Sequence, residues 1–155
     1  FSSSRYYLHC NQIAHRDLKQ SNIVHGCNEG GPESIRIVDS GFAIQSRAEN
    51  GMLMTPCYTA QYVAPEVLRQ GYDRSCDVWS LGVILYAMLS GQAPFPSSQE
   101  GDEEASVARR LCKGAYSMDG PVWMKISHSC QDLVRRLLHV DPHKRPTVRQ
   151  ITLHP

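Results

Sequence analysis

The segment from Asp77 to Ser90 constrains the fold more than any other part of this sequence, because it is apolar on nearly every face of a helix and is followed by Gly91. A helix that is hydrophobic all round has to be buried, and glycine commonly ends helices. Its most apolar part, Val78 to Leu89, falls short of the ~20 residues that a membrane-spanning helix needs. We therefore expect a core helix that other parts of the chain surround, and no membrane partner.

The composition of the 155 residues is typical of one ordinary globular domain. Hydrophobic residues make up 41% and charged residues 20%, and the net charge of +1 indicates no nucleic-acid partner. Six cysteines are spread along the chain without a CxxC or a Cys/His zinc spacing. They indicate the reduced thiols of a cytoplasmic protein, and a disulfide framework is the less favoured alternative.

Local signals predict a small β-hairpin followed by a mainly helical body. Two short apolar runs, Asn22–His25 and Ser34–Val38, flank a stretch rich in turn formers, which favours a hairpin. Residues up to about His9 are typical of the end of a helix, and residues 39–66 lack periodicity, which is typical of a functional loop. Further helices are predicted over residues 103–113 and 130–138 and from Thr147 onward.

Three short motifs occur in a fixed order in the first half of the chain. Residues 15–22 read HRDLKQSN, residues 39–41 read DSG and residues 64–66 read APE. Each corresponds to a motif of protein kinases, and the order of the three is the order in which kinases carry them. His15 has no partner at metal-ligand spacing, so we interpret it as a packed, hydrogen-bonded histidine.

The residue types in these motifs suit phosphoryl transfer, which needs a positioned nucleophile and neutralised phosphate charge. Asp17 would accept the proton of a substrate hydroxyl, and Lys19 would contact the transferring group. Asn22 and Asp39 would supply hard oxygen ligands for Mg²⁺ bound to the phosphates of ATP. The alternative, that these are solvated turn residues, is disfavoured because three motifs occur in the correct order.

The chain resembles the C-terminal lobe of eukaryotic protein kinases over essentially its whole length. This resemblance implies a partial kinase domain, residues 1–155, with a catalytic loop at 13–22, a metal-binding and activation segment at 39–66 and a helical body at 77–155. It implies that Asp77 braces the catalytic loop and that Arg145 pairs with Glu66, two structural roles. A lysine at position 19 is similar to the serine/threonine-directed members.

The stretch from Arg47 to Ala60 is similar to the activation loop of the C-terminal kinase domain of RSK-type ribosomal kinases, in the calcium/calmodulin-kinase-like group. The resemblance implies that a proline-directed MAP kinase phosphorylates Thr55, which precedes a proline, and that Arg16 pairs with the phosphate. An unmodified loop threonine is the alternative for Thr55. The resemblance also implies that Thr59 hydrogen-bonds the catalytic aspartate and lysine and shapes the substrate groove.

Two departures from the kinase pattern bear on activity. The 155 residues include no glycine-rich phosphate loop and no strand lysine, so we expect this chain to represent a kinase domain without its N-terminal lobe and to be inactive on its own. Ser40 stands where the family has phenylalanine, which fills more volume.

The motifs and the resemblance together predict a cytoplasmic, and also nuclear, serine/threonine kinase that acts on protein substrates. The alternatives are a non-catalytic binding or scaffold module and an unstable fragment.

Overall fold

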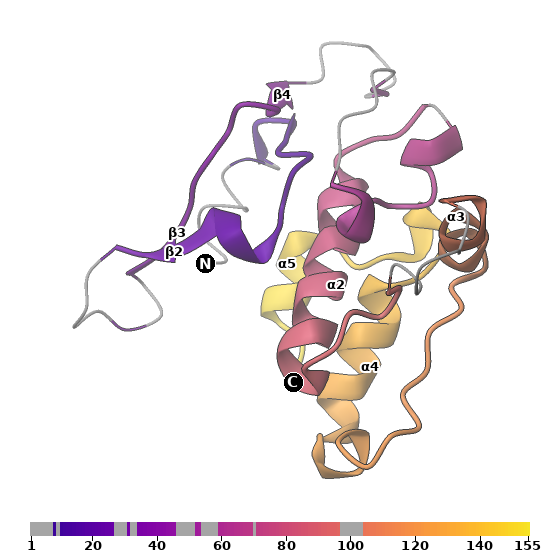
Figure 1. The fold of residues 1–155 in the computed structure, drawn as a ribbon. Coiled ribbons are helices and arrows are strands. Elements are labelled where there is room, and N and C mark those ends of the chain that lie inside the picture. The colour runs from indigo at the N-terminus through magenta and orange to yellow at the C-terminus, as the bar shows by residue number, and fades with distance from the viewer. Residues whose placement is uncertain are drawn as a thin grey trace.

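The computed structural model describes the chain in segments: Leu8, residues 10–26, Gly31, and residues 34–45, 52–53, 59–69, 71–96 and 104–155. Most of the helix expected up to His9 lies outside the described residues, although Leu8 and Cys10 are helical. Figure 1 shows the strands on one side of the molecule and the helices on the other. The described chain is mostly helical with small two-stranded sheets.

The first third of the described chain contains two antiparallel pairs of strands. β2 (Ile23–His25) pairs with β3 (Ile35–Ile37), with Ile23 opposite Ile37, which confirms the predicted hairpin. β1 (Ile13–Ala14) pairs with β4 (Ile44–Gln45), within segments for which we predicted loops. Strands of two residues are too short to show an alternating pattern, so the sequence carries no signal for this second pairing.

The helical body contains α2 (Ser75–Ser90), α3 (Glu104–Lys113), α4 (His128–Leu137) and α5 (Val148–Thr152). All four lie within a few residues of the predicted helices. Short 3-10 turns connect the elements: η1 (Gln20–Asn22), η3 (Ala60–Tyr62), η4 (Val67–Arg69), η5 (Trp123–Lys125) and η6 (Pro142–Lys144). The Thr147 and Gln150 side chains form a reciprocal capping box that starts α5.

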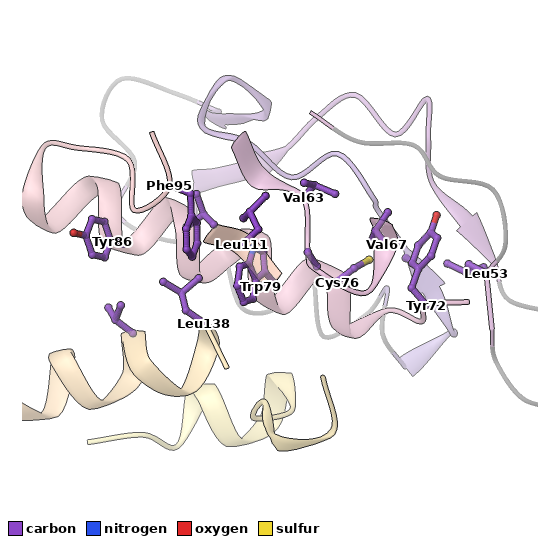
Figure 2. Close-up of a cluster of buried hydrophobic side chains, with 14 of the residues drawn as sticks. Leu53, Val63, Val67, Tyr72, Cys76, Trp79, Tyr86, Phe95, Leu111 and Leu138 are labelled. Atoms are coloured by element: carbon purple, nitrogen blue, oxygen red, sulfur yellow. The ribbon is translucent and has the colours of Figure 1, made fainter. Parts of the chain in front are cut away.

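α2 is the central helix of the body, as its sequence predicted. Trp79 is completely buried and stacks on Phe95 with ring centroids 5.4 Å apart. Figure 2 shows this cluster, to which Leu111 of α3 and Leu138 also contribute. The last turn differs from the prediction, because the Met88 side chain is 73% exposed.

Gly82 lets α4 pack closely on α2. A Cβ atom at this position would lie 2.8 Å from Cβ of Leu137 and 2.9 Å from Cδ2 of Leu138, closer than carbon atoms can approach. The absence of a side chain therefore sets the distance between the two helices.

Candidate active site

The catalytic-loop segment is fixed to the first turn of α2. The buried Asp77 carboxylate accepts hydrogen bonds from the backbone N–H groups of His15 (2.8 Å) and Arg16 (2.9 Å). Arg16 has a backbone φ of +69°, a conformation that is costly for a residue with a side chain. The two hydrogen bonds from the backbone of the loop to the Asp77 carboxylate hold this turn in place. The His15 ring is packed, but neither ring nitrogen has a hydrogen-bond partner among the described residues, which corrects our expectation of a hydrogen-bonded ring.

Three polar side chains surround the carboxylate of Asp17, which is 4% exposed. Lys19 donates from Nζ to Oδ2 over 2.7 Å, and Thr59 donates from Oγ1 to Oδ1 over 2.6 Å. Asn22 donates from Nδ2 to the Asp17 backbone carbonyl over 2.9 Å. The buried carboxylate therefore has a fixed orientation.

The balance of these interactions lowers the pKa of Asp17 below its ordinary value. Burial on its own would raise this pKa, but the hydrogen bonds from Lys19, Thr59 and Asn22 and the positive charge of Lys19 outweigh burial. The pKa of Lys19 is raised in return, chiefly by its hydrogen bond to Asp17. At neutral pH the site therefore holds a carboxylate and an ammonium group in contact.

The β2–β3 hairpin brings Asn22 and Asp39 to the same end of one small sheet. Asn22 directly precedes β2 and Asp39 follows β3 by two residues, and in an antiparallel pair these two ends coincide. A hydrogen bond from Val38 N–H to the Asn22 carbonyl (2.9 Å) closes this end. Asp39 is exposed, with a φ of +61°, and its charge contributes to the raised pKa of Lys19.

The donor set at this end of the hairpin fits a magnesium ion shared with phosphates. The Asn22 amide nitrogen is committed to Asp17, which leaves the amide oxygen as its other polar atom, and Asp39 contributes a carboxylate. No group of three or more His, Cys, Asp and Glu residues suited to a metal occurs in the described part of the chain. Magnesium needs no such group, since it is usually held by one or two protein oxygens together with substrate phosphates.

Ser40 lies on the surface of the described chain, and Phe42, two residues later, is half-exposed. Serine at this position therefore opens no hole in the core described above. The hollow beside Asp17, lined among others by Thr59 and Tyr62, has a volume of about 10 Å³. That is room for about one water molecule, whereas small-molecule pockets have roughly 300–1,000 Å³. This hollow is thus not a nucleotide site.

The segment after Thr59 is anchored to α2. Ser80, one turn after Asp77, donates a hydrogen bond to the carbonyl of Tyr62 (2.9 Å). α2 therefore positions the catalytic loop through Asp77 and the Thr59–Tyr62 segment through Ser80. The resemblance implied that Thr59 contacts both Asp17 and Lys19; the structure places its hydroxyl on Asp17.

Glu66 and Arg145 form a bidentate ion pair, with N–O distances of 2.6 and 2.7 Å. The Arg145 side chain is completely buried, and that of Glu66 is 12% exposed. The guanidinium also lies 5.0 Å from the centre of the Trp79 ring and donates to backbone carbonyls of His139, Ser75 and Val140. This pair ties the end of the activation segment to the helical body.

Arg16 contacts two segments far from it in the sequence. Its Nε donates to the Phe42 carbonyl over 2.6 Å, and one terminal nitrogen donates to the Tyr72 hydroxyl over 3.2 Å. Thr55, the predicted phosphoacceptor, lies outside the described residues. Tyr72 and Ser80 were missed by the sequence analysis, because neither belongs to a catalytic motif and both act through contacts distant in sequence.

The motif order, the hairpin and the arrangement around Asp17 define a class of protein, and comparison with known families agrees. Residues 3–155 match the protein kinase domain family. The chain therefore belongs to the protein kinase family. No helix in the described part of the chain has the length and hydropathy required to cross a membrane.

Within this family the chain is homologous to the ribosomal protein S6 kinases, which are serine/threonine kinases, and this confirms the resemblance found in the motifs. Ribosomal protein S6 kinase alpha-3 of Homo sapiens is 55% identical over 150 residues, which cover 96% of this chain and 20% of that protein. Ribosomal protein S6 kinase 2 alpha of Xenopus laevis is 54% identical over 148 residues, 95% of this chain and 20% of that protein. The chain spans about a fifth of the length of these relatives.

Proposed function

We propose that the chain is the C-terminal lobe of a serine/threonine protein kinase domain, corresponding to the C-terminal kinase domain of the RSK type. Joined to an N-terminal lobe, it transfers the γ-phosphoryl group of ATP to hydroxyls of protein substrates. The observation that carries the proposal is the fixed Asp17 carboxylate, held by Lys19 and Thr59 close to the hairpin end that bears Asn22 and Asp39. The domain organisation predicted from the motifs is part of this proposal.

Each of the four site residues has a different role in the proposed reaction. Asp17, which its lowered pKa keeps ionised, orients the substrate hydroxyl and accepts its proton as the oxygen attacks the γ-phosphorus. The bond from phosphorus to the bridging oxygen breaks, and ADP leaves. Lys19 offsets charge on the transferring group. Asn22 and Asp39 would hold Mg²⁺, whose charge offsets that of the phosphates.

The described residues supply only part of this machinery. In kinases a strand lysine paired with a glutamate, and a glycine-rich loop, complete the nucleotide site. The hollow beside Asp17, with a volume of about 10 Å³, is too small for ATP and agrees with a nucleotide site that needs a second lobe to enclose it. We therefore expect no turnover from residues 1–155 alone.

Substitution of Asp17 in the gene product that carries this chain tests the proposal. Asp17→Asn keeps the shape of the side chain but removes the base, so phosphoryl transfer from labelled ATP to a protein substrate should fall by at least about a hundredfold. Asp132→Asn is the matched control, because it makes the same change on α4, where Asp132 bonds Arg136 and His154. Unchanged transfer in Asp17→Asn, with the fold intact by circular dichroism, would contradict a catalytic role.

The alternative function is a non-catalytic binding or scaffold module. Ser40 in place of phenylalanine and the small hollow beside Asp17 favour it. The two functions differ in one measurement: a binding module shows no transfer above background in the wild type, and Asp17→Asn then changes nothing.

The homology also leads us to propose how the protein is regulated and where in the cell it acts. A proline-directed MAP kinase would phosphorylate Thr55, and Arg16 would pair with the phosphate. The protein would act on protein substrates in the cytoplasm and the nucleus. Phosphorylation of Thr55 by a purified kinase of this type, followed by mass spectrometry and activity assay, tests the first step.

A further inference from the structure

The start of α2 borders a second hollow in the described chain, much larger than the one beside Asp17. Its volume is about 520 Å³, within the range of roughly 300–1,000 Å³ that is typical of small-molecule sites. No described residue lines both hollows. The proposed transfer of a phosphoryl group therefore does not use this second hollow.

Three parts of the chain that are far apart in the sequence line this hollow, which we call the α2–α5 pocket. They are Cys10 and Gln12, residues between 73 and 78 at the start of α2, and residues between 142 and 149 up to the start of α5. Val78 and Val148, 3% and 6% exposed, and the neighbouring Pro146 give the pocket an apolar wall. Such a wall can pack against the apolar body of an organic molecule.

The rest of the lining carries an excess of positive charge. Arg74, His143 and Arg149 are exposed residues that line the pocket, and Asp73 is the only acidic residue among the described lining residues. One oxygen of the Asp73 carboxylate already accepts a hydrogen bond from the Ser75 backbone N–H over 2.8 Å. Arginine binds carboxylate and phosphate groups through two parallel hydrogen bonds, so this lining suits an anion.

Two side chains of the lining have polar groups available for a ligand. The Arg149 guanidinium forms no hydrogen bond or ion pair with another described residue, since only the backbone of Arg149 takes part in a bond, to Thr152. The Ser75 hydroxyl is buried and has no hydrogen-bond partner among the described residues. Buried polar atoms normally have a partner, so an unpaired hydroxyl in the wall of a pocket calls for an explanation such as a ligand or a water molecule.

We propose that the α2–α5 pocket binds a small organic anion, an apolar body that carries a carboxylate or a phosphate group. The body packs against Val78 and Val148, and the charged group pairs with Arg149 and Arg74. An inorganic anion would leave the apolar wall uncovered, and an uncharged apolar molecule would leave the arginines without a counter-ion. The site lies outside the catalytic motifs, and its ligand need not take part in phosphoryl transfer.

The first test measures binding of phenyl phosphate to the gene product that carries this chain, by isothermal titration calorimetry. Phenyl phosphate combines an apolar ring with a phosphate group, whereas inorganic phosphate and phenol each supply one of the two parts. We expect phenyl phosphate to bind at least about tenfold more tightly than either part, because each part lacks one set of contacts. Equal affinity of inorganic phosphate or of phenol overturns the proposal.

The second test locates the binding site with a pair of matched variants. Arg149→Met removes the charge but keeps an unbranched side chain, and loss of a hydrogen bond to a charged group should weaken phenyl phosphate binding by about tenfold. Arg109→Met is the control, because Arg109 is also an exposed arginine on a helix, α3, and does not line the pocket. An unchanged dissociation constant in Arg149→Met, or an equal loss in Arg109→Met, overturns the proposal.

A thiol in the lining gives a third readout that needs no substitution. Cys10 is exposed and lines the pocket, whereas Cys130 on α4 does not line it. Phenyl phosphate should therefore slow the alkylation of Cys10 by iodoacetamide and leave that of Cys130 unchanged, as measured by peptide mass spectrometry. If Cys10 is not protected at saturating phenyl phosphate, the proposal is wrong. None of the three readouts requires phosphoryl transfer, so failure of the catalytic proposal would leave them intact.

Discussion

Removing Glu66 should destabilise the protein strongly, because it leaves a charge in the core. The Arg145 side chain is completely buried, and Glu66→Ala takes away its counter-ion. Breaking a buried ion pair by removing one partner costs about 3–5 kcal/mol. Arg145 would keep three backbone carbonyls and the Trp79 ring, so we expect the lower end, about 3 kcal/mol. For a chain of this size that corresponds to a fall in melting temperature of roughly 6–12 °C.

Thermal unfolding followed by circular dichroism measures this loss in the gene product that carries the chain. Glu66→Gln provides a graded variant, since an amide oxygen can still accept from the guanidinium, and it should lose less than Glu66→Ala. Asp132→Ala is the control, because its pair with Arg136 is exposed, at 45% and 60% of the two side chains. If Glu66→Ala melts no lower than Asp132→Ala, Arg145 does not depend on Glu66 as its counter-ion, and the reasoning is wrong.

Two further predictions concern the packing of α2 and the ionisation of the site. Gly82→Ala should lower the free energy of unfolding by up to about 2 kcal/mol, because the clash with Cβ of Leu137 outweighs the gain in helix propensity. Urea unfolding measures this free energy, and an equal or higher stability of Gly82→Ala would contradict the prediction. Lys19→Met removes a hydrogen bond and a positive charge that lower the pKa of Asp17. Because a carboxylate with a lowered pKa loses its function as the pH falls through that pKa, the acid limb of the kcat/KM profile should move to higher pH in Lys19→Met. If the acid limb does not move while activity stays measurable, the ionisation of Asp17 does not produce that limb.

The parts of the fold that follow local rules were predictable. The β2–β3 hairpin follows from two apolar runs around turn formers, and α4 follows from one apolar stripe at helical spacing. The motif residues Asp17, Asn22 and Asp39 could be proposed as site residues from the sequence because phosphoryl-transfer chemistry restricts such positions to a few residue types. The placement of Asn22 and Asp39 at one end of the hairpin follows from antiparallel pairing.

Features that depend on distant contacts were not predictable from local patterns. The β1–β4 pairing joins two-residue strands that carry no periodic signal. The positive φ of Arg16 depends on the Asp77 carboxylate, which lies 61 residues further along the chain. The exposure of Met88 depends on where the packing partners of α2 end, and an apolar helix sequence does not contain that information.

The site is assembled from residues made at different times during synthesis. Asp77 fixes the backbone of His15, which the ribosome adds 62 residues earlier, and Arg145 follows its partner Glu66 by 79 residues. At about 5–20 residues per second, the catalytic loop waits some 3–12 s for the helix that fixes it. Glu66 is without its partner Arg145 for longer, because 79 residues separate the two. In a nascent chain the loop around His15 therefore lacks its anchor until Asp77, near the middle of these 155 residues, has been added, and the anchor of Glu66 is complete only once Arg145 follows.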